Sequence, residues 1–293
     1  MNTIVIIIVA TIGTFLGSLC GIGGGIIIKP ILDAFDYFTH FQVGLISMSC
    51  VLTTSLSAVI KHLLNKTHIK FKDSITLAIG SILGGIAGAF LLNIVKESII
   101  NAFHTDPESA PTEHGKGSII ITIIQNALIM FFMMLVLLYM LVLKKKGISF
   151  HLENIFIICA IGLFLGLISV FMDIGGGAIN VCIFVLLFSM DVKSVAVDSL
   201  LVIVFSQTAK FVQYAVIGNF QKYVVFDDKL PWWLFVVLIV ISVITGIYGS
   251  VLNRKIKANY IDYAYNLSIF AIILIAGFNV IAGSIKLGDF SEA

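Results

Sequence analysis

The composition of this 293-residue chain excludes an ordinary soluble globular protein. Hydrophobic residues make up 59% of the sequence, charged residues make up 12%, and the mean hydropathy is +1.09. Soluble domains usually hold about 25% charged residues, so lipid is the expected solvent. The formal net charge of +2 is small, and the basic residues lie in connectors rather than along one helix face, so we expect no nucleic-acid partner.

Ten apolar stretches follow one another along the chain with short polar connectors between them. The longer ones reach the ~20 residues that a helix needs to cross a ~30 Å hydrocarbon core. No Lys or Arg precedes the first stretch, so we expect it to be mature structure rather than a signal peptide. The predicted fold class is an all-α polytopic membrane protein with about 8 to 10 membrane segments. The stretches cover residues 4–19, 26–38, 43–64, 74–95, 118–143, 154–171, 178–190, 192–217, 231–252 and 262–285.

Glycine clusters interrupt two apolar runs at matching positions. One reads Gly21-Ile22-Gly23-Gly24-Gly25, and the other reads Ile174-Gly175-Gly176-Gly177 directly after Asp173. Other residues recur in the same order: Ser57, Ala58 and His62 match Thr208, Ala209 and Gln213, and Ser81, Gly85 and Gly88 match Ser242, Gly246 and Gly249. The sequence therefore predicts a duplication, with one unit at residues 1–150 and a second at residues 151–293.

The positions of the basic residues indicate how the units are oriented, because short cytoplasmic loops are enriched in Lys and Arg. If each glycine-broken run crosses the membrane once as a kinked helix, the third basic cluster lies outside. If each run is a hairpin that returns on the side it entered, all three clusters lie inside and the second unit is inverted. We favour two inverted repeats, each a glycine-tipped hairpin plus three transmembrane helices, a plan common in secondary transporters. The clusters are Lys61, Lys66, Lys70 and Lys72, then Lys144, Lys145 and Lys146, then Arg254, Lys255 and Lys257.

The two glycine clusters are the predicted binding site for an anion. Glycine permits the positive φ angles of a tight reversal and lets a ligand approach the backbone closely. The arm after each cluster begins with unpaired N–H groups at the positive end of a helix dipole. The alternative is that glycines only permit close helix packing, which suits Gly80, Gly84, Gly85 and Gly88. The predicted substrate-binding glycines are Gly23, Gly24, Gly25, Gly175, Gly176 and Gly177.

Ionisable residues within the apolar stretches are candidates for a functional role, because a charge in the hydrocarbon region costs free energy unless it is paired or hydrated. Asp173 adjoins the second glycine cluster and Asp198 lies within 192–217, and both are predicted to carry a coupling proton. Lys29 follows the first cluster and is predicted to attract the anion. The alternative for Lys29 is extension to the membrane interface.

Neutral polar residues supply further predicted contacts with the substrate. Ser49, Asn180 and Ser199 are the predicted hydrogen-bond donors, or else they only join helices. The four cysteines lie in or beside apolar stretches without the spacing of a zinc or haem site. We therefore expect reduced, packed cysteines and no metal or cofactor.

The glycine clusters belong to a longer doubled pattern. It consists of Gly17-Ser18-Leu19-Cys20-Gly21-Ile22-Gly23-Gly24-Gly25 with Pro30 after it, Ile174-Gly175-Gly176-Gly177, Asp198-Ser199-Leu200 and the stretch 81–88. With this pattern the chain resembles, over nearly its whole length, the TauE/SafE sulfite exporters, also called toluene sulfonate uptake permeases. It departs from the family pattern in the second unit, where residues 170–173 read Val-Phe-Met-Asp and Cys182 stands in place of the proline.

The resemblance implies a secondary transporter, a permease or exporter of small sulfur-containing anions such as sulfite, sulfonates or sulfoacetate. It implies a multi-pass protein of the cell membrane, the inner membrane in a bacterium, driven by an H⁺ or Na⁺ gradient. The expected partners are a small anionic substrate, bilayer lipid and the coupling ion. One alternative is transport of another small anion, or of a cation that Asp173 and Asp198 bind. An intramembrane enzyme is not expected, because the sequence holds no Gly-x-Ser-x-Gly or His-Glu-x-x-His motif.

Overall fold

The computed structural model describes residues 3–35, 37–38, 40–66, 71–102, 116–172, 174–216 and 230–292. The short turns η1 (Tyr139–Leu143) and η2 (Lys144–Lys146) prolong α5. The α-helices correspond to the ten predicted apolar stretches, and the described ranges contain no strand, so the predicted all-α fold is confirmed. They are α1 (Thr3–Cys20), α2 (Gly25–Phe35), α3 (His40–Leu64), α4 (Phe71–Ala102), α5 (Lys116–Leu138), α6 (Ile155–Met172), α7 (Gly177–Phe188), α8 (Val192–Val216), α10 (Trp232–Lys255) and α11 (Ala258–Glu292).

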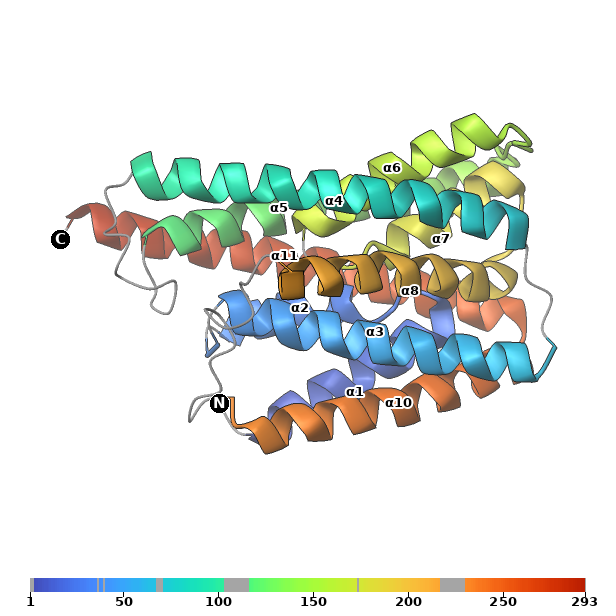
Figure 1. Ribbon diagram of the computed structural model, residues 1–293, viewed down its shortest axis with the longest axis horizontal. Helices are drawn as coiled ribbons and strands as arrows, with labels where there is room; N and C mark the ends of the chain where they lie inside the picture. Colours follow the sequence, from blue (N-terminus) through green and yellow to red (C-terminus); the bar gives the residue numbers. More distant parts are fainter. Residues whose placement is uncertain are drawn as a thin grey trace.

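The helices lie along one long axis and form a bundle (Figure 1). In the described part of the chain, eight of them are long and apolar enough to cross a membrane. Large apolar side chains such as Ile12, Phe90 and Leu274 are exposed on the outside of the bundle. A bundle with an apolar exterior requires lipid around it. The chain is therefore a multi-pass membrane protein, as predicted.

Helices α1 and α2 form a hairpin that returns to the end of the bundle at which it entered. Gly17 of α1 lies against Gly24 at the turn, and Gly13, one helical turn further back, lies against Ile28 of α2. The amide of Gly23 donates to the carbonyl of Gly17 over 3.1 Å. These contacts pair residues at increasing distance from the turn, which is the geometry of two antiparallel helices.

Helices α6 and α7 form a second hairpin from the opposite end. The amide of Phe150, just before α6, donates to the carbonyl of Leu186 near the end of α7 over 2.7 Å, and Leu152 donates to Leu187 over 3.1 Å. The end of α7 therefore lies beside the start of α6. In Figure 1, α1 begins at the left end near the N-terminus, whereas α6 begins at the right end.

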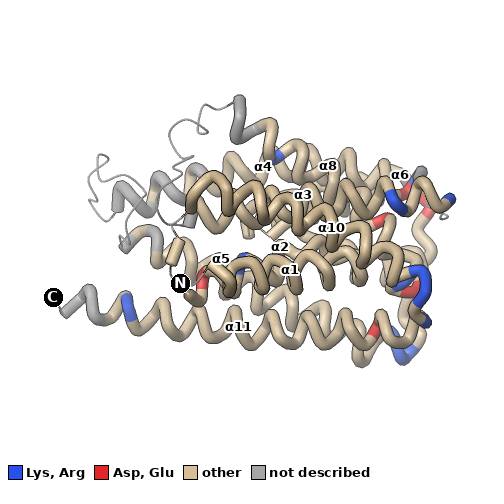
Figure 2. The backbone as a smooth tube through the Cα atoms, turned by 90° about the horizontal axis from the view of Figure 1, so that it is seen from below, with Lys and Arg blue, Asp and Glu red and all other residues tan. Residues whose placement is uncertain are grey.

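Most described Lys and Arg residues collect at one end of the bundle (Figure 2). The ends of α3 and α10, the start of α4 and the η2 turn, which hold the described residues of the three basic clusters, all lie there, whereas Lys70 lies outside the described residues. At this end, Lys193 donates to the carbonyls of Arg254 and Ile256 over 3.1 and 2.8 Å. This distribution agrees with the hairpin arrangement that we favoured. The duplication into units 1–150 and 151–293 and their inverted relation remain predictions.

Glycines bring α4 and α6 into close contact. A Cβ atom on Gly84 would overlap with the carbonyl of Leu163, and one on Gly88 would lie 2.6 Å from the carbonyl oxygen of Leu167. From the other helix, Gly162 faces Leu77, and further contacts join Gly80 to Cys159 and Gly166 to Ser81. A small residue in each successive helical turn lets two membrane helices pack backbone against backbone.

Candidate functional site

The two glycine turns meet inside the bundle. A Cβ atom on Gly25 would lie 3.2 Å from the carbonyl oxygen of Ile174, and one on Gly177 would overlap with the carbonyl oxygen of Ile22. The first residue of α2 and the first residue of α7 each lie against the turn of the other hairpin. A side chain on Gly177 would push the hairpins apart, whereas one on Gly25 would first overlap with Val51 of α3, 2.5 Å from its Cβ, and would also crowd the second turn.

Positive φ angles shape both turns. Gly23 and Gly24 have φ values of +76° and +81°, and Gly175 and Gly176 have values of +76° and +70°. Residues with a side chain rarely adopt this conformation, because Cβ would clash with the backbone. The predicted reversals at the glycine clusters are therefore present in the structure.

Serines from α8 and α3 hold the two turns. The Ser199 hydroxyl donates to the carbonyl of Gly21 over 2.7 Å and lies 3.3 Å from the carbonyl of Gly177. The Ser47 hydroxyl lies 3.5 Å from the carbonyl of Gly25, a long hydrogen bond. Each serine follows its glycine by the same 22 positions. Ser199 was predicted as a site residue, whereas Ser47 was missed although this spacing could have revealed it.

Ser49, the predicted serine on α3, lies two residues beyond Ser47. An α-helix turns its side chain about 200° away over that distance. The Ser49 hydroxyl is buried and has no hydrogen-bond partner in the described ranges. Its predicted role in substrate binding therefore rests on this spare hydroxyl rather than on a contact with the turns.

The first amide of each helix that follows a turn has no hydrogen-bond acceptor among the described residues. Gly24 and Gly176 accept hydrogen bonds from Ile28 and Asn180, as the residue before a helix does. The amides of Gly25 and Gly177 donate to no acceptor in the described part of the chain. Such amides, with the helix dipole behind them, form the part of a helix that binds anions.

Two side-chain amides lie beside the second turn. The Nε2 atom of Gln207 would lie 2.7 Å from a Cβ atom on Gly175, and Oδ1 of Asn180 would lie 3.7 Å from one on Gly176. The amide oxygens of both side chains are buried without a hydrogen-bond partner among the residues described. Buried polar atoms of this kind are costly unless a ligand or water satisfies them. Asn180 was predicted as a substrate-binding residue, and Gln207 joins it.

Lys29 lies one helical turn after Gly25 and forms an ion pair inside the bundle. Its Nζ atom is 3.2 Å from Oδ2 of Asp33, and the two side chains are 0% and 4% exposed. The Asn126 side chain donates to the same Asp33 oxygen over 3.2 Å. Asn279 donates to Asn126 over 3.0 Å and to the carbonyl of Pro30 over 2.8 Å. The network joins α2 to α5 and α11.

Sequence reasoning missed three members of this network. Asp33 follows Lys29 by four positions, a spacing that places two side chains on one helix face and could have been read. Asn126 and Asn279 gave no such signal, because they lie on distant helices. Lys29 itself, a predicted site residue, is buried rather than extended to the membrane interface.

The structure describes one of the two carboxylates that were predicted to carry a proton. Asp173 lies outside the described residues. Asp198 is fully buried and accepts a hydrogen bond from Ser74 of α4 over 2.6 Å. It therefore lies on the α4 side of α8, while Ser199 beside it contacts the turns. Its role in proton coupling remains a prediction.

The described residues include no group of three or more His, Cys, Asp and Glu side chains that could hold a metal ion. The four cysteines are free thiols, and three of them are buried. The groups at the two turns are backbone and side-chain amides that form hydrogen bonds, with one buried ion pair nearby.

Comparison with known proteins identifies the family. The model of the sulfite exporter TauE/SafE family matches residues 5–277, which include both glycine turns and the Lys29 network except its last residue. A probable membrane transporter protein of Methanocaldococcus jannaschii is 38% identical over 102 residues. That match covers 32% of this chain and 38% of the relative, so it spans well under half of either protein. No solved structure matches. The chain belongs to the sulfite exporter TauE/SafE family.

Proposed function

We propose that this protein is a secondary transporter of small sulfur-containing anions such as sulfite, sulfonates or sulfoacetate, and that the anion binds between the two glycine turns. The proposal rests on the meeting of two helix N-termini, at Gly25 and Gly177, whose first amides have no acceptor among the described residues. The family description, sulfite exporter, supports the choice of substrate.

Backbone amides suit this substrate class. A sulfite or sulfonate group has three oxygen atoms that accept hydrogen bonds, and charge-assisted hydrogen bonds from amides are short and strong. The positive ends of the α2 and α7 dipoles add attraction without a permanent charge. The Nε2 group of Gln207, which lies beside Gly175, would donate to one of the remaining oxygens. Asn180, whose Oδ1 atom faces Gly176, would donate from its side-chain NH2 group after the amide turns over.

The contact between the turns indicates how the substrate gains access. Because Gly25 lies against Ile174 and Gly177 lies against Ile22, an anion binds only after the two hairpins separate. The hairpins enter from opposite ends of the bundle (Figure 1). Movement of one hairpin would open the site to one side, and movement of the other would open it to the opposite side, as alternating access requires.

The Lys29–Asp33 pair supplies a route for coupling to protons. Lys29 lies one turn from the Gly25 amide, so an anion bound there competes with Asp33 for the lysine. A proton on Asp33 would remove that competition, because a neutral carboxyl group holds the ammonium group less strongly. Anion binding and protonation of Asp33 therefore favour each other. Asp173 and Asp198 remain further candidates for the coupling site.

Flux measurements on the full-length protein in proteoliposomes test this function. We expect labelled sulfite to accumulate when a pH gradient is imposed and not when only a Na⁺ gradient is imposed, and we expect no uptake of labelled Na⁺ or K⁺. The Asp33→Asn variant should exchange sulfite across the membrane but no longer accumulate it. Uptake of a cation, or no flux of any sulfur anion by folded protein, would contradict the proposal.

A further inference from the structure

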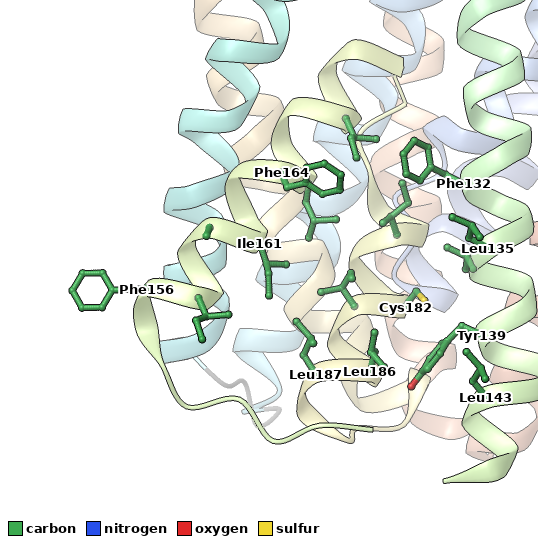
Figure 3. Close-up of a pocket in the computed structure, with 17 residues that line it drawn as sticks. Phe132, Leu135, Tyr139, Leu143, Phe156, Ile161, Phe164, Cys182, Leu186 and Leu187 are labelled. Atoms are coloured by element: carbon green, nitrogen blue, oxygen red, sulfur yellow. The ribbon is translucent and has the colours of Figure 1, made fainter. Parts of the chain in front are cut away.

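A deep apolar groove lies between α5, α6 and α7, on the outside of the bundle (Figure 3). Its volume is about 760 Å³, within the ~300–1,000 Å³ range of small-molecule sites. Leu135 of α5, Phe164 of α6 and Leu186 of α7 are among the side chains that line it. Leu135 and Phe164 are 47% and 58% exposed, so the groove opens toward the lipid.

The groove exists because the two hairpins close differently. In the first hairpin, Gly13 and Gly17 of α1 face α2 and let the arms touch. In the second hairpin, Gly162 and Gly166 of α6 instead face the carbonyls of Leu77 and Ser81 on α4. The face of α6 toward α7 carries larger apolar side chains, which keep these arms apart.

The length and position of the groove match one leaflet of a bilayer. On α6 its lining runs from Phe156 to Ile168, which is about 18 Å at 1.5 Å per residue. One leaflet contributes about half of a ~30 Å hydrocarbon core. On α7 the lining runs from Leu187, near the basic end of the bundle, to Ile179, two residues from the Gly177 turn. The groove therefore extends from the membrane surface to its middle.

Positive charge lies at the outer end of the groove. Leu143 lines the groove and is followed directly by Lys144, Lys145 and Lys146. Lys144 pairs with Asp262 over 2.6 Å, whereas Lys145 and Lys146 are exposed and form no ion pair within the described ranges. Two unpaired lysines at the surface end of an apolar groove attract a negatively charged lipid headgroup.

From this combination we propose that the groove binds an anionic phospholipid of the leaflet on the basic side, with acyl chains between α6 and α7 and the headgroup at Lys145 and Lys146. The hydrocarbon region holds no water to fill an apolar space, and lipid chains are the apolar molecules present there. The proposal does not depend on which substrate the protein transports.

A lipid in this groove would act on the transport site through α7. One side of α7 borders the groove at Ile179 and Ile183, and the other side carries Gly177 and Ala178. The Tyr265 hydroxyl donates a hydrogen bond to the Ala178 carbonyl over 2.6 Å. The lipid would pack against α7 from the groove side. Its presence would therefore favour the position in which the second hairpin contacts the first.

Native mass spectrometry of the purified full chain tests the proposal. Phosphatidylglycerol and phosphatidylcholine with identical acyl chains are the probes. We expect one phosphatidylglycerol molecule to be retained more tightly than phosphatidylcholine. The Lys145→Gln/Lys146→Gln variant should lose this preference, by about fivefold for each lysine. The matched control, Lys255→Gln/Lys257→Gln, removes two exposed charges at the same end and should keep the preference.

A second pair of variants tests the groove itself. Ala160 lines the groove and is exposed, so Ala160→Trp fills the space without altering the core. It should lower retention of both lipids, whereas Ile244→Trp on the outer face of α10 should not. Equal retention of the two lipids by the wild type, an equal loss in both lysine pairs, or no effect of Ala160→Trp would each overturn the proposal.

Discussion

At the scale of single residues, the buried ion pair between Lys29 and Asp33 is not explained by packing. Two charges in a low-dielectric interior cost free energy even when paired, and apolar replacements of similar volume are often equally stable or more stable. Inside a membrane bundle this cost is at its highest. A pair with only a structural role would be replaceable, so we infer that its charges serve transport.

Single and double substitutions of Lys29 and Asp33 separate a structural role of the pair from a role in transport. Lys29→Met leaves Asp33 buried without its partner, and we expect it to lower the free energy of unfolding by about 3–5 kcal/mol. Lys29→Met/Asp33→Leu should regain most of that stability, yet sulfite flux in proteoliposomes should be lost in both variants. Unfolding in denaturant and flux are the two measurements.

The control for this prediction is the partly exposed ion pair between Lys144 and Asp262 at the basic end, with side chains 27% and 31% exposed. Lys144→Met/Asp262→Leu removes an ion pair of the same type and should change stability by at most about 1 kcal/mol while flux is retained. Transport at the wild-type rate by Lys29→Met/Asp33→Leu would show that the buried pair is only structural.

At the same scale, sequence reasoning found the glycines and Lys29 but not the residues that complete their surroundings. Ser199 was found because it lies in the doubled pattern, and Asp33 could have been found from its four-residue spacing to Lys29. Asn126 lies 93 positions from Asp33, and Asn279 lies 249 positions from Pro30. Contacts over such separations follow from helix packing, which the spacing of residues in one sequence does not encode.

Among the helices, the contact between α4 and α6 shows how glycines with a packing role differ from those at the turns. Gly84 and Gly88 have ordinary helical φ angles and face carbonyl groups of α6. They determine how closely the two backbones approach. The sequence interpretation of these glycines as packing residues agrees with this contact.

A methyl group at this contact should therefore reduce stability. Gly84→Ala places Cβ on the carbonyl of Leu163, and we expect a loss of about 1–3 kcal/mol, measured as a lower melting temperature in detergent. Gly277→Ala on α11 is the control, because its Cβ would lie 3.5 Å from the Met130 sulfur, an ordinary contact. If the two variants melt at the same temperature, the close contact of α4 with α6 is not needed for stability.

The helices themselves were predictable from the lengths of the apolar stretches and from the glycine clusters. The groove between α5, α6 and α7 was not. It depends on the face of α6 to which Gly162 and Gly166 point, toward α4 rather than α7. The sequence shows the spacing of those glycines, but only the packed structure shows which neighbouring helix they contact.

For the whole molecule, the hairpin arrangement places the ends of α5 and α10 on the same side of the membrane. A single kinked crossing by each glycine-broken run would place them on opposite sides. The basic clusters at these ends predict that the shared side is the cytoplasm. The end of α11 lies at the opposite end of the bundle (Figure 1).

Single-cysteine labelling in intact cells tests this topology. In a background without native cysteines, Lys145→Cys and Lys255→Cys should both resist a membrane-impermeant maleimide until the cells are opened. Lys286→Cys, near the far end of α11, should react from outside. Labelling of Lys145→Cys and Lys255→Cys from opposite sides would contradict the hairpins.

The site itself depends on both halves of the molecule, because each glycine turn needs the other to form the predicted anion site. Gly25 is the most informative position. Its φ angle lies outside the positive range that favours glycine, so alanine introduces no backbone strain. Its Cβ would nevertheless lie 2.5 Å from Cγ2 of Val51, 2.9 Å from the Ser47 hydroxyl and 3.2 Å from the Ile174 carbonyl oxygen. Gly25→Ala therefore narrows the space between the turns and also presses the first turn against Val51 of α3, so the melting temperature has to be measured beside flux.

The most direct measurement is sulfite flux in proteoliposomes by Gly25→Ala, with Gly277→Ala as the matched control and melting temperature as the check on folding. We predict that flux falls at least about tenfold in Gly25→Ala, the loss expected when one charge-assisted hydrogen bond is displaced, and is unchanged in the control. Wild-type flux by folded Gly25→Ala protein would contradict an anion site between the two glycine turns.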